Sequence, residues 1–246
     1  MPIAALYDIH GNLPALEAAL AEIEQVGVDR IVIGGDVMPG PMAREVIEVL
    51  LAHDLPLHFI HGNGETAVLT EMAGGKSSVP EQFRSVIQWH ARTLEDYEDL
   101  LSDWPLTKSL EVDGVGRVLF CHATPRDDNE IFTRLTSEES LLPIFDAVEA
   151  DVVVCGHTHM QFDRTIGGTR VLNAGSVGMP FGLPGAHWLL IGPDIELRRT
   201  HYDLDDAARR IRQSDYPQAD EFVARYVVER PSEEQMLQAF GKVPLK

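Results

Sequence analysis

Residues 2–36 read PIAALYDIHGNLPALEAALAEIEQVGVDRIVIGGD, and this stretch decides the fold. Residues 2–7 and 30–34 are short apolar runs, which are typical of buried strands. Between them, Asn12, Leu13 and Pro14 begin a helix, because proline is favoured in the first helical turn. A strand, a helix and a second strand predict a right-handed β-α-β unit with parallel strands.

The same alternation continues to residue 61. The first helix has one apolar face at helical spacing, formed by Leu16, Ala19, Leu20 and Ile23. Residues 43–52 predict a second helix, and residues 57–61 predict a third apolar strand. This part of the chain therefore predicts three parallel strands joined by two crossover helices.

Composition and charge limit the class of protein. The chain has 246 residues, of which 44% are hydrophobic and 24% charged, and this suits one globular α/β domain. Its formal net charge is −19, from 39 acidic and 20 basic residues. Such a balance argues against a general nucleic-acid binder or membrane-surface binder, which needs a basic footprint. A phosphate substrate stays open, because bound metal ions can supply local positive charge.

The two cysteines, Cys121 and Cys155, each end an apolar run. So few cysteines favour a reducing compartment, with a disulfide between them as the minor alternative. Residues 2–7 are too short for a signal peptide or a membrane span, and we find neither in the sequence. We therefore expect a cytoplasmic protein.

The middle of the chain predicts a helical segment with two interpretations. We expect a helix at 65–73, a loop at 74–78 and a polar, mostly helical stretch at 80–104. Residues 77–105 form either a helical cap inserted over the functional site or a plain pair of surface helices.

Strands outnumber helices in the second half. We predict strands at 117–121, 151–155, 170–173, 187–191 and 195–202, with one clear helix at 138–148. Few helices separate these strands, so we expect a second, partly antiparallel sheet, with the two halves of the chain forming the two sheets of one sandwich. Helices predicted at 205–213, 218–228 and 232–240 make residues 203–246 a helical C-terminal tail packed on a domain of residues 1–202.

Five short motifs each follow an apolar strand and carry side chains that bind metal ions. They are Asp8-Ile9-His10, Gly34-Gly35-Asp36, Gly62-Asn63, Cys121-His122 and Gly156-His157-Thr158-His159. Strand ends in α/β sheets bring such side chains together. The motifs supply two carboxylates, four imidazoles and one amide, a ligand set for two divalent cations. Two adjacent cations indicate hydrolysis of phosphate esters.

The residue types suit two neighbouring metal ions. The pairs Asp8/His10 and His157/His159 have a spacing of two, which places both side chains on one side of an extended chain. Asp36 offers two oxygens, so it can bridge two cations. Imidazole, carboxylate and amide ligands suit Mn, which we favour, as well as Fe, Zn, Ni or Co.

Taken in order, these motifs resemble the calcineurin-like metallophosphoesterase superfamily over about residues 1 to 200. The turn at residues 173–176, Asn-Ala-Gly-Ser, is similar to one in the compact prokaryotic branch of that family, which includes phosphodiesterases. The resemblance implies an α/β fold, a four-layer α/β/β/α sandwich of two mixed sheets.

The resemblance also implies a role for each ligand. One metal would take Asp8, His10 and His159; the other would take Asn63, His122 and His157. Asp36 would bridge them, and a metal-bridging hydroxide would attack phosphorus in line. We expect Asp36, His10, Asn63 and His122 to be the catalytic residues.

The third motif departs from the pattern of the family. Many members have a histidine after Gly-Asn that helps to protonate the leaving group, whereas this chain has Gly64. Loss of a general acid typically costs about 100- to 10,000-fold in rate, so another group serves or the leaving group is a good one. His61 is one candidate; Glu65 is another, although a carboxylate near a helix N-terminus is its simpler interpretation. Members that also lack this histidine resemble phosphodiesterases.

Two further residues are candidates for substrate binding. Arg126 follows His122 in the chain, and its planar guanidinium suits a pair of phosphate oxygens. The alternative is an ion pair with Asp127, Asp128 or Glu130. Asn12 could bind a phosphate oxygen or cap a helix, and the sequence does not decide between these roles.

We predict a metal-dependent phosphoesterase that acts on a small phosphate ester, with phosphodiesters preferred. The alternatives are a phosphomonoesterase for phosphoproteins or nucleotides, and a dinucleoside tetraphosphate hydrolase. A non-catalytic metal-binding scaffold is the alternative of another class, but a scaffold tolerates ligand loss and all seven ligands are present. We leave the oligomeric state open, with a homo-oligomer as one alternative.

Overall fold

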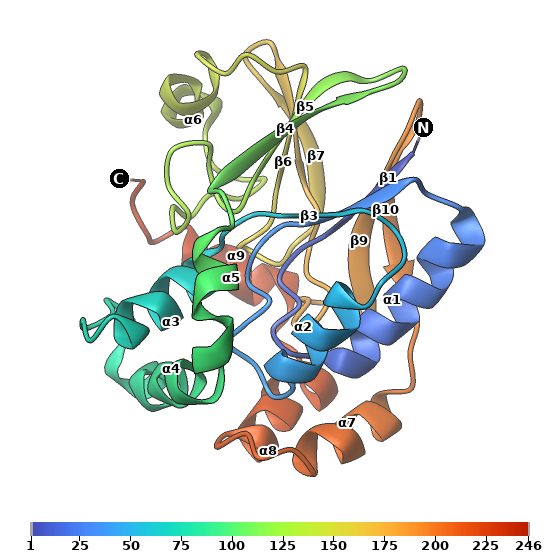
Figure 1. Ribbon diagram of the computed structural model, residues 1–246. Helices are drawn as coiled ribbons and strands as arrows, with labels where there is room; N and C mark the ends of the chain where they lie inside the picture. The colour runs from blue at the N-terminus through green and yellow to red at the C-terminus, as the bar shows by residue number, and fades with distance from the viewer. Residues whose placement is uncertain (1, 246) are drawn as a thin grey trace.

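The computed structural model of the protein describes residues 2–245 and has two mixed five-stranded sheets at its centre (Figure 1). The first sheet has the order β10-β9-β1-β2-β3, from β1 (Ile3–Leu6), β2 (Arg30–Ile33), β3 (Leu57–Phe59), β9 (Ala186–Ile191) and β10 (Ile195–Thr200). The second has the order β4-β5-β6-β8-β7, from β4 (Thr107–Val112), β5 (Gly116–Cys121), β6 (Val152–Cys155), β7 (Phe162–Ile166) and β8 (Thr169–Asn173). The predicted fold class is confirmed.

Parallel pairing joins the first three strands as predicted, with Ala4 beside Ile31 and Val32 beside His58. The expectation that each half of the chain forms its own sheet is wrong. Strands β9 and β10 lie in the first sheet, where β9 pairs antiparallel with β1 through Ala4 and Leu190. Periodicity could not show this exchange, because an apolar strand fits either sheet of a sandwich.

Two strands were not predicted, and both are edge strands of the second sheet. Among the strands of residues 2–245, β4 pairs only with β5, and β7 only with β8. Their sequences, TKSLEV and FDRTI, mix polar and apolar residues, because one face of each strand is open to solvent.

Helices cover both outer faces of the sandwich. On the side of the first sheet lie α1 (Leu13–Val26), α2 (Ala43–Leu51), α3 (Asn63–Met72), α4 (Glu81–Thr93), the 3-10 turn η1 (Glu95–Tyr97) and α5 (Glu98–Ser102). On the side of the second sheet lies α6 (Glu138–Phe145). The C-terminal segment forms α7 (Leu204–Arg212), α8 (Ala219–Phe222), the π-helix η2 (Val223–Val228) and α9 (Glu233–Phe240).

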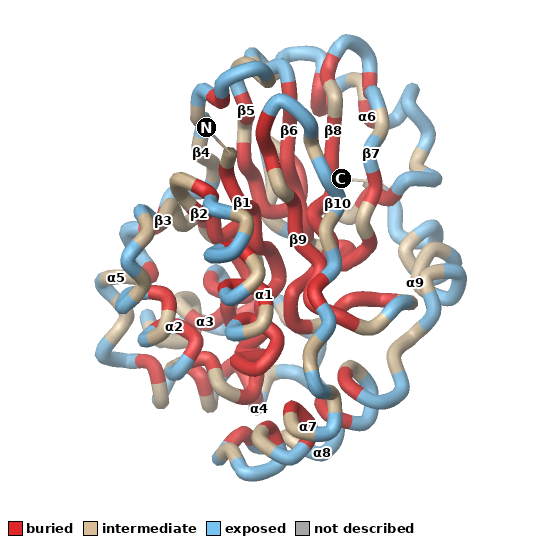
Figure 2. Tube along the Cα trace, turned by 90° about the vertical axis from the view of Figure 1, so that its right-hand side faces the viewer, coloured by how far each residue is buried: buried red, intermediate tan, exposed pale blue. Residues whose placement is uncertain are grey.

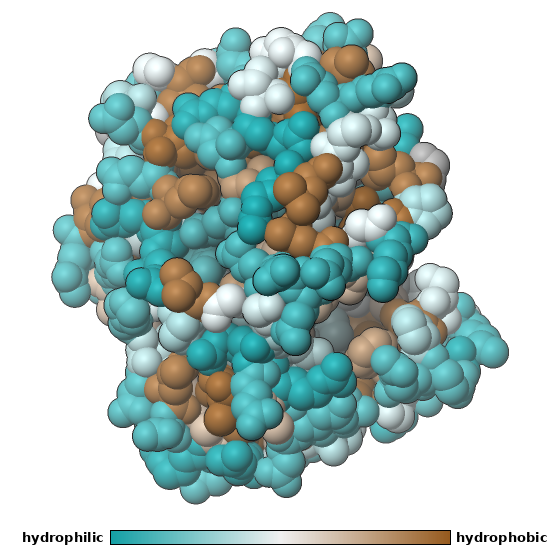
Figure 3. All heavy atoms as spheres, turned by 180° about the vertical axis from the view of Figure 1, so that it is seen from behind, coloured by the Kyte–Doolittle hydropathy of each residue, from teal (hydrophilic) through white to brown (hydrophobic). Residues whose placement is uncertain are grey.

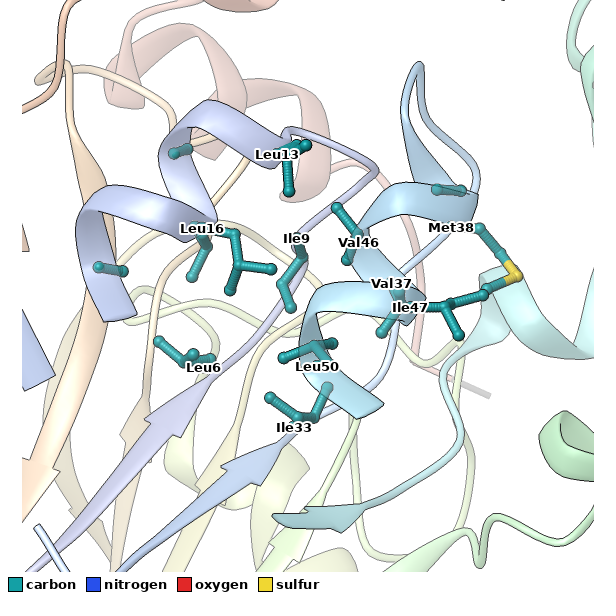
Figure 4. Close-up of a cluster of buried hydrophobic side chains, with 14 of the residues drawn as sticks. Leu6, Ile9, Leu13, Leu16, Ile33, Val37, Met38, Val46, Ile47 and Leu50 are labelled. Carbon is teal, nitrogen blue, oxygen red and sulfur yellow. The ribbon is translucent and has the colours of Figure 1, made fainter. Parts of the chain in front are cut away.

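The start and end of α1 follow from local chemistry. The Asn12 Oδ1 accepts a hydrogen bond from the Ala15 N–H at 3.3 Å, and Pro14 occupies the first turn. Gly27 ends the helix with a φ of 76°, a conformation that glycine adopts without steric cost. The apolar face of α1 packs with α2 on the first sheet, as Figure 4 shows for Leu16 and Ile33.

Three apolar clusters separate the layers. In β1, Ala4 and Leu6 face the helices, whereas Ile3 and Ala5 face the second sheet, which is why residues 3–6 are apolar without a break. The third cluster lies between the second sheet and α6, around Phe145. Figure 2 shows buried residues running through the strands of both sheets. Within residues 2–245, no helix has both the length and the apolar character needed to cross a membrane.

A fourth apolar cluster joins α4 to the C-terminal segment. It contains Val86 of α4 together with Ile211, Tyr216, Phe222 and Val223. Helices α7 and α8 lie at the bottom of Figure 1, below α4 and α1. Segments far apart in the sequence therefore form one packed wall at this end of the molecule.

Candidate metal centre

The seven predicted ligands lie at the ends of five strands, at the edge where the two sheets meet. Asp8 and His10 follow β1, Asp36 follows β2, and Asn63 is the first residue of α3 after β3. In the second sheet, His122 follows β5, and His157 and His159 follow β6. The structure brings these residues together, although the motifs are up to about 150 positions apart in the sequence.

Five of these ligands have an unusual backbone conformation. Within residues 2–245, the non-glycine residues with positive φ are Asp8 (53°), His10 (46°), Asp36 (51°), His157 (64°) and His159 (56°). A left-handed conformation costs such residues about 1–2 kcal/mol each. Strain of this kind gathers at functional sites, where the surrounding structure fixes it.

One group of ligand atoms surrounds Asp8. Its Oδ1 lies 3.2 Å from the His159 Nε2 and 3.9 Å from the His10 Nε2, and the two imidazole Nε2 atoms are 3.2 Å apart. The Asp8 Oδ1 is buried and has no hydrogen-bond partner within residues 2–245, whereas Oδ2 accepts from the His157 N–H at 2.8 Å. An unpartnered buried carboxylate oxygen between two imidazole nitrogens fits a cation.

A second group surrounds His122. Its Nε2 lies 3.1 Å from the Asn63 Oδ1 and 3.5 Å from the Asp36 Oδ1. The His157 ring contacts that of His122, with centroids 5.3 Å apart, and the buried His157 Nε2 has no partner within the described part of the chain. Asp8 also lies 3.8 Å from the His122 Nε2, so its Oδ1 is near both groups.

Asp36 lies between the two groups. Its Oδ2 is 3.7 Å from the His10 Nε2, and its Oδ1 is 3.5 Å from the His122 Nε2. One carboxylate thus presents a different oxygen to each set of ligands, which is the arrangement that a bridging ligand needs.

Backbone carbonyls orient three of the imidazoles. The Nδ1 atoms of His10, His122 and His159 lie 2.9, 2.8 and 2.8 Å from the carbonyl oxygens of Pro39, Gly34 and Met179. A carbonyl oxygen only accepts, so each Nδ1 donates its proton. The Nε2 lone pairs are then available to metal ions, an orientation typical of metal-binding histidines. Together with the unpartnered oxygen of Asp8, this shows that the residues fit two divalent cations.

The charges in the site are strongly coupled. Burial would raise the pKa of Asp8, but the charge of His159, 3.2 Å from its Oδ1, holds that pKa well below its usual range with help from His122. Burial raises the pKa of Asp36 to about 7, against the opposing effect of His122. Burial opposes protonation of His122, yet Asp36 and Asp8 raise its pKa to about 9. Without a cation, a proton on His122 therefore balances part of the carboxylate charge.

Two other ligands are neutral at pH 7. Burial, joined by the charge of a neighbouring histidine, lowers the pKa of His10 and of His157 to about 3. Neutral imidazole is the form that binds metals, so these two histidines give up no proton when a cation arrives.

Glu65 has a supporting role that the sequence showed only in part. It occupies the third position of α3, and its Oε2 accepts from the Gly62 N–H at 2.8 Å, as its interpretation as a carboxylate at a helix N-terminus predicts. The buried carboxylate also accepts from the Asp36 and Val37 N–H groups, both at 2.8 Å. Glu65 therefore fixes the loop that carries Asp36 to the helix that carries Asn63.

The space beside Gly64 explains why the third motif has no histidine. A Cβ atom on Gly64 would lie 2.0 Å from the Met38 carbonyl oxygen, and the Gly64 N–H donates to the Asp36 Oδ1 at 2.6 Å. A side chain cannot fit there unless the loop moves. His61 is half-buried, and its Nδ1 lies 3.1 Å from the Thr66 hydroxyl. Thr66 in turn donates to Asp128 at 2.5 Å.

The two predicted substrate-binding residues have other partners. Arg126 donates from Nε and Nη2 to the buried Glu130, at 3.0 and 2.5 Å, which matches its ion-pair alternative. Asn12 caps α1 through Oδ1, and its Nδ2 donates to the Gly178 carbonyl oxygen at 2.9 Å and to the Tyr202 hydroxyl at 3.3 Å. The contact through Oδ1 matches the capping alternative for Asn12.

A cavity of about 650 Å³ opens from the metal centre, where His10, Asp36 and Asn63 line its inner end. Its walls come from the segment between α3 and α4, from α4, and from the C-terminal segment. Figure 3 shows a hollow in the rear face beside the lobe that contains α3 and α4. Arg126 and Asn12 do not line this cavity. Sequence patterns gave no signal for the C-terminal wall, because its aromatic residues have the spacing of ordinary core residues.

Comparison with known proteins relates the chain to one family. A model of the calcineurin-like phosphoesterase superfamily domain matches residues 1–191. An uncharacterized protein of Methanocaldococcus jannaschii is 29% identical over an alignment of 246 residues that covers 88% of this chain and 94% of that protein.

Solved structures show the same fold over nearly the whole chain. A hypothetical protein of Pyrococcus horikoshii superposes with a TM-score of 0.78 at 20% identity, covering 94% of this chain and 99% of that one. A metallophosphoesterase of Sphaerobacter thermophilus superposes with a TM-score of 0.70 at 25% identity, covering 92% and 97%.

Proposed function

We propose, since the chain belongs to the calcineurin-like phosphoesterase superfamily, that it hydrolyses phosphate esters with two divalent cations and prefers phosphodiesters. The observation that carries the proposal is the position of Asp36. Its two oxygens lie 3.7 Å from the His10 Nε2 and 3.5 Å from the His122 Nε2, so it can hold both cations at once. When bound, the cations supply polarisation of the phosphate oxygens and a water molecule of lowered pKa.

The ligand residues form two sets, one for each cation. Asp8, His10 and His159 form the first ligand set. The second consists of Asn63, His122 and His157, and Asp36 bridges the two sets. Backbone carbonyls hold His10, His122 and His159 with Nε2 toward the ligand positions, so that little reorganisation is needed when a cation or a substrate binds.

Gly64 supports the preference for phosphodiesters. With the Met38 carbonyl oxygen closing this position, no side chain there can protonate a poor leaving group. The cavity also carries Asp128 and Glu221, beside one lysine, Lys76. A phosphodiester has one negative charge and a phosphomonoester up to two, so a diester meets less repulsion from these carboxylates.

The cytoplasmic location remains a prediction, and both cysteines are free and buried.

The test is hydrolysis of bis-p-nitrophenyl phosphate beside p-nitrophenyl phosphate in the presence of Mn²⁺. We expect faster cleavage of the diester, and we expect Asp36→Asn to abolish it while the circular dichroism spectrum is unchanged. Asp54→Asn, which makes the same chemical change at an exposed loop position, should keep the activity of the wild type.

Each outcome of this test decides between alternatives. Faster cleavage of the monoester would reject the diester preference in favour of a phosphomonoesterase. If Mn²⁺ binds and neither ester is cleaved, the non-catalytic scaffold becomes the better interpretation. Normal activity of Asp36→Asn would reject the bridging role.

A further inference from the structure

The outer part of the cavity has a different chemistry from the metal centre. Four aromatic residues line it: Phe83 on α4, and Tyr216, Phe222 and Tyr226 in the C-terminal segment. A volume of about 650 Å³ is within the range of sites that enclose drug-sized molecules. Inorganic phosphate or a methyl phosphate would leave most of this aromatic wall in contact with water.

The spacing of the C-terminal residues places them on one side. Gln218, Phe222 and Tyr226 are four positions apart, which aligns side chains along a helix, and all three line the cavity. The segment passes from α8 into the π-helix η2, where the Glu229 N–H donates to the Ala224 carbonyl oxygen, five residues earlier, at 2.8 Å. Such π-helical turns often occur at functional sites.

Two phenol hydroxyls of this wall have no protein partner. Tyr216 is only 9% exposed, yet neither its hydroxyl nor that of Tyr226 makes a hydrogen bond within residues 2–245. A tyrosine hydroxyl that lines a cavity without a protein partner is available to bond a ligand. Burial raises the pKa of Tyr216 well above its usual value, so its hydroxyl stays protonated and able to donate to a ligand at any ordinary pH.

Packing holds this wall in place without a ligand. Val86 of α4 lies in one apolar cluster with Phe222, Val223 and Ile211, so both sides of the outer cavity belong to one packed unit. The match to the superfamily ends at residue 191, before this C-terminal wall begins. The C-terminal part of the outer wall is therefore separate in the sequence from the metal centre, whereas Phe83 lies between two of its ligands, Asn63 and His122.

We propose that the substrate is a phosphate ester whose organic group carries an aromatic ring, which binds between Phe83 and the tyrosines Tyr216 and Tyr226. The ring is either a nucleobase or a simple aryl group; both offer a flat face to the aromatic wall. This inference rests on the proposed function for the ester, but the ring site itself can be tested by binding alone.

The first experiment compares three diesters with the same leaving group in the Mn²⁺-loaded protein. They are the p-nitrophenyl phosphates of thymidine (through its 5′ oxygen), phenol and methanol. We expect kcat/KM, corrected for the uncatalysed rate, to be at least about tenfold higher for an ester with a second ring than for the methyl ester, whose only ring is in the leaving group. Tyr226→Leu should lower that ratio by about three- to tenfold, the range expected for one aromatic contact. Tyr97→Leu, at a half-buried tyrosine outside the cavity, should leave the ratio unchanged.

The second experiment measures binding by calorimetry, so that it remains decisive even if no ester is hydrolysed. We expect AMP or phenyl phosphate to bind at least about tenfold more tightly than ribose 5-phosphate, and Tyr226→Leu to weaken this binding. Tighter binding of AMP than of phenyl phosphate identifies a nucleoside, and the reverse identifies an aryl group. Equal affinity for compounds with and without a ring would overturn the inference, whatever the result for hydrolysis.

Discussion

Glu65 offers a quantitative test of how the metal centre is built. The substitution Glu65→Gln keeps the size of the side chain and removes its charge. The carboxylate accepts four backbone N–H groups, from Gly62, Asp36 and Val37 at 2.8 Å each and from Met38 at 3.4 Å. An amide has only one oxygen, so it must turn its NH₂ group toward at least one of these donors.

The expected loss of stability follows from this count. In its better orientation, the glutamine oxygen still accepts from Gly62 and Asp36, whereas the bond from Val37 and the longer one from Met38 are lost. A hydrogen bond to a charged group contributes about 1.5–3 kcal/mol, and a buried N–H left without a partner costs about 1–3 kcal/mol. Part of this is offset, because the charge of Glu65 contributes to raising the pKa of Asp36 and its removal relieves that repulsion. We expect the free energy of unfolding to fall by about 2–4 kcal/mol.

The assay is urea denaturation of the metal-free protein, followed by measurement of Mn²⁺ affinity. Glu45→Gln, at an exposed position in the first turn of α2, is the matched control and should change stability by less than about 0.5 kcal/mol. The affinity for Mn²⁺ should also fall for Glu65→Gln, because the loop of Asp36 is no longer fixed to α3. A loss of less than about 1 kcal/mol with unchanged Mn²⁺ affinity would refute the reasoning.

Two further predictions concern the same centre. Gly64→Ala should destabilise the protein by about 2 kcal/mol or more, because its Cβ would lie 2.0 Å from the Met38 carbonyl oxygen. The control Gly168→Ala, whose Cβ would have no atom within 4 Å, should not lower the stability. Equal unfolding midpoints of the two variants in urea would contradict this prediction. Binding of Mn²⁺ at pH 7 should release protons, because the pKa values of His122 (about 9) and Asp36 (about 7) are both raised and a cation needs the deprotonated forms. The affinity for Mn²⁺ should therefore rise with pH up to about 9. Calorimetry in two buffers of different ionisation enthalpy measures the number of protons released on binding. Proton uptake instead of release would contradict the prediction.

The sequence predicted the positions of the ligands well, because each one directly follows a strand. An apolar run that ends in Asp8 or Asp36 predicts both a strand and the edge of the sheet at which the carboxylate lies. The order of the motifs then identified the family. The β4 and β7 strands were missed for the opposite reason: each lies at the edge of the second sheet, so its residues follow no regular apolar pattern.

Contacts between distant segments were beyond the reach of the sequence. Arg126 was a reasonable phosphate ligand by its position after His122, and only the structure shows its bidentate contact with Glu130. The additional bonds from Glu65 to Asp36 and Val37 depend on the packing of two loops. The aromatic wall of the cavity forms only when α4 packs against the C-terminal segment. The local sequence pattern of neither segment predicts this contact.

The left-handed conformation of the five ligands limits how this site can change during evolution. Residues branched at Cβ are the least able to adopt positive φ, whereas glycine and asparagine adopt it readily. A lineage that loses a metal ion should thus pass through asparagine or glycine at positions such as Asp8 or His157, and seldom through valine or isoleucine. A sequence with asparagine at these positions would keep the loop geometry, so regaining metal binding would need only a side-chain change. The backbone preserves the shape of the site after its chemistry is lost.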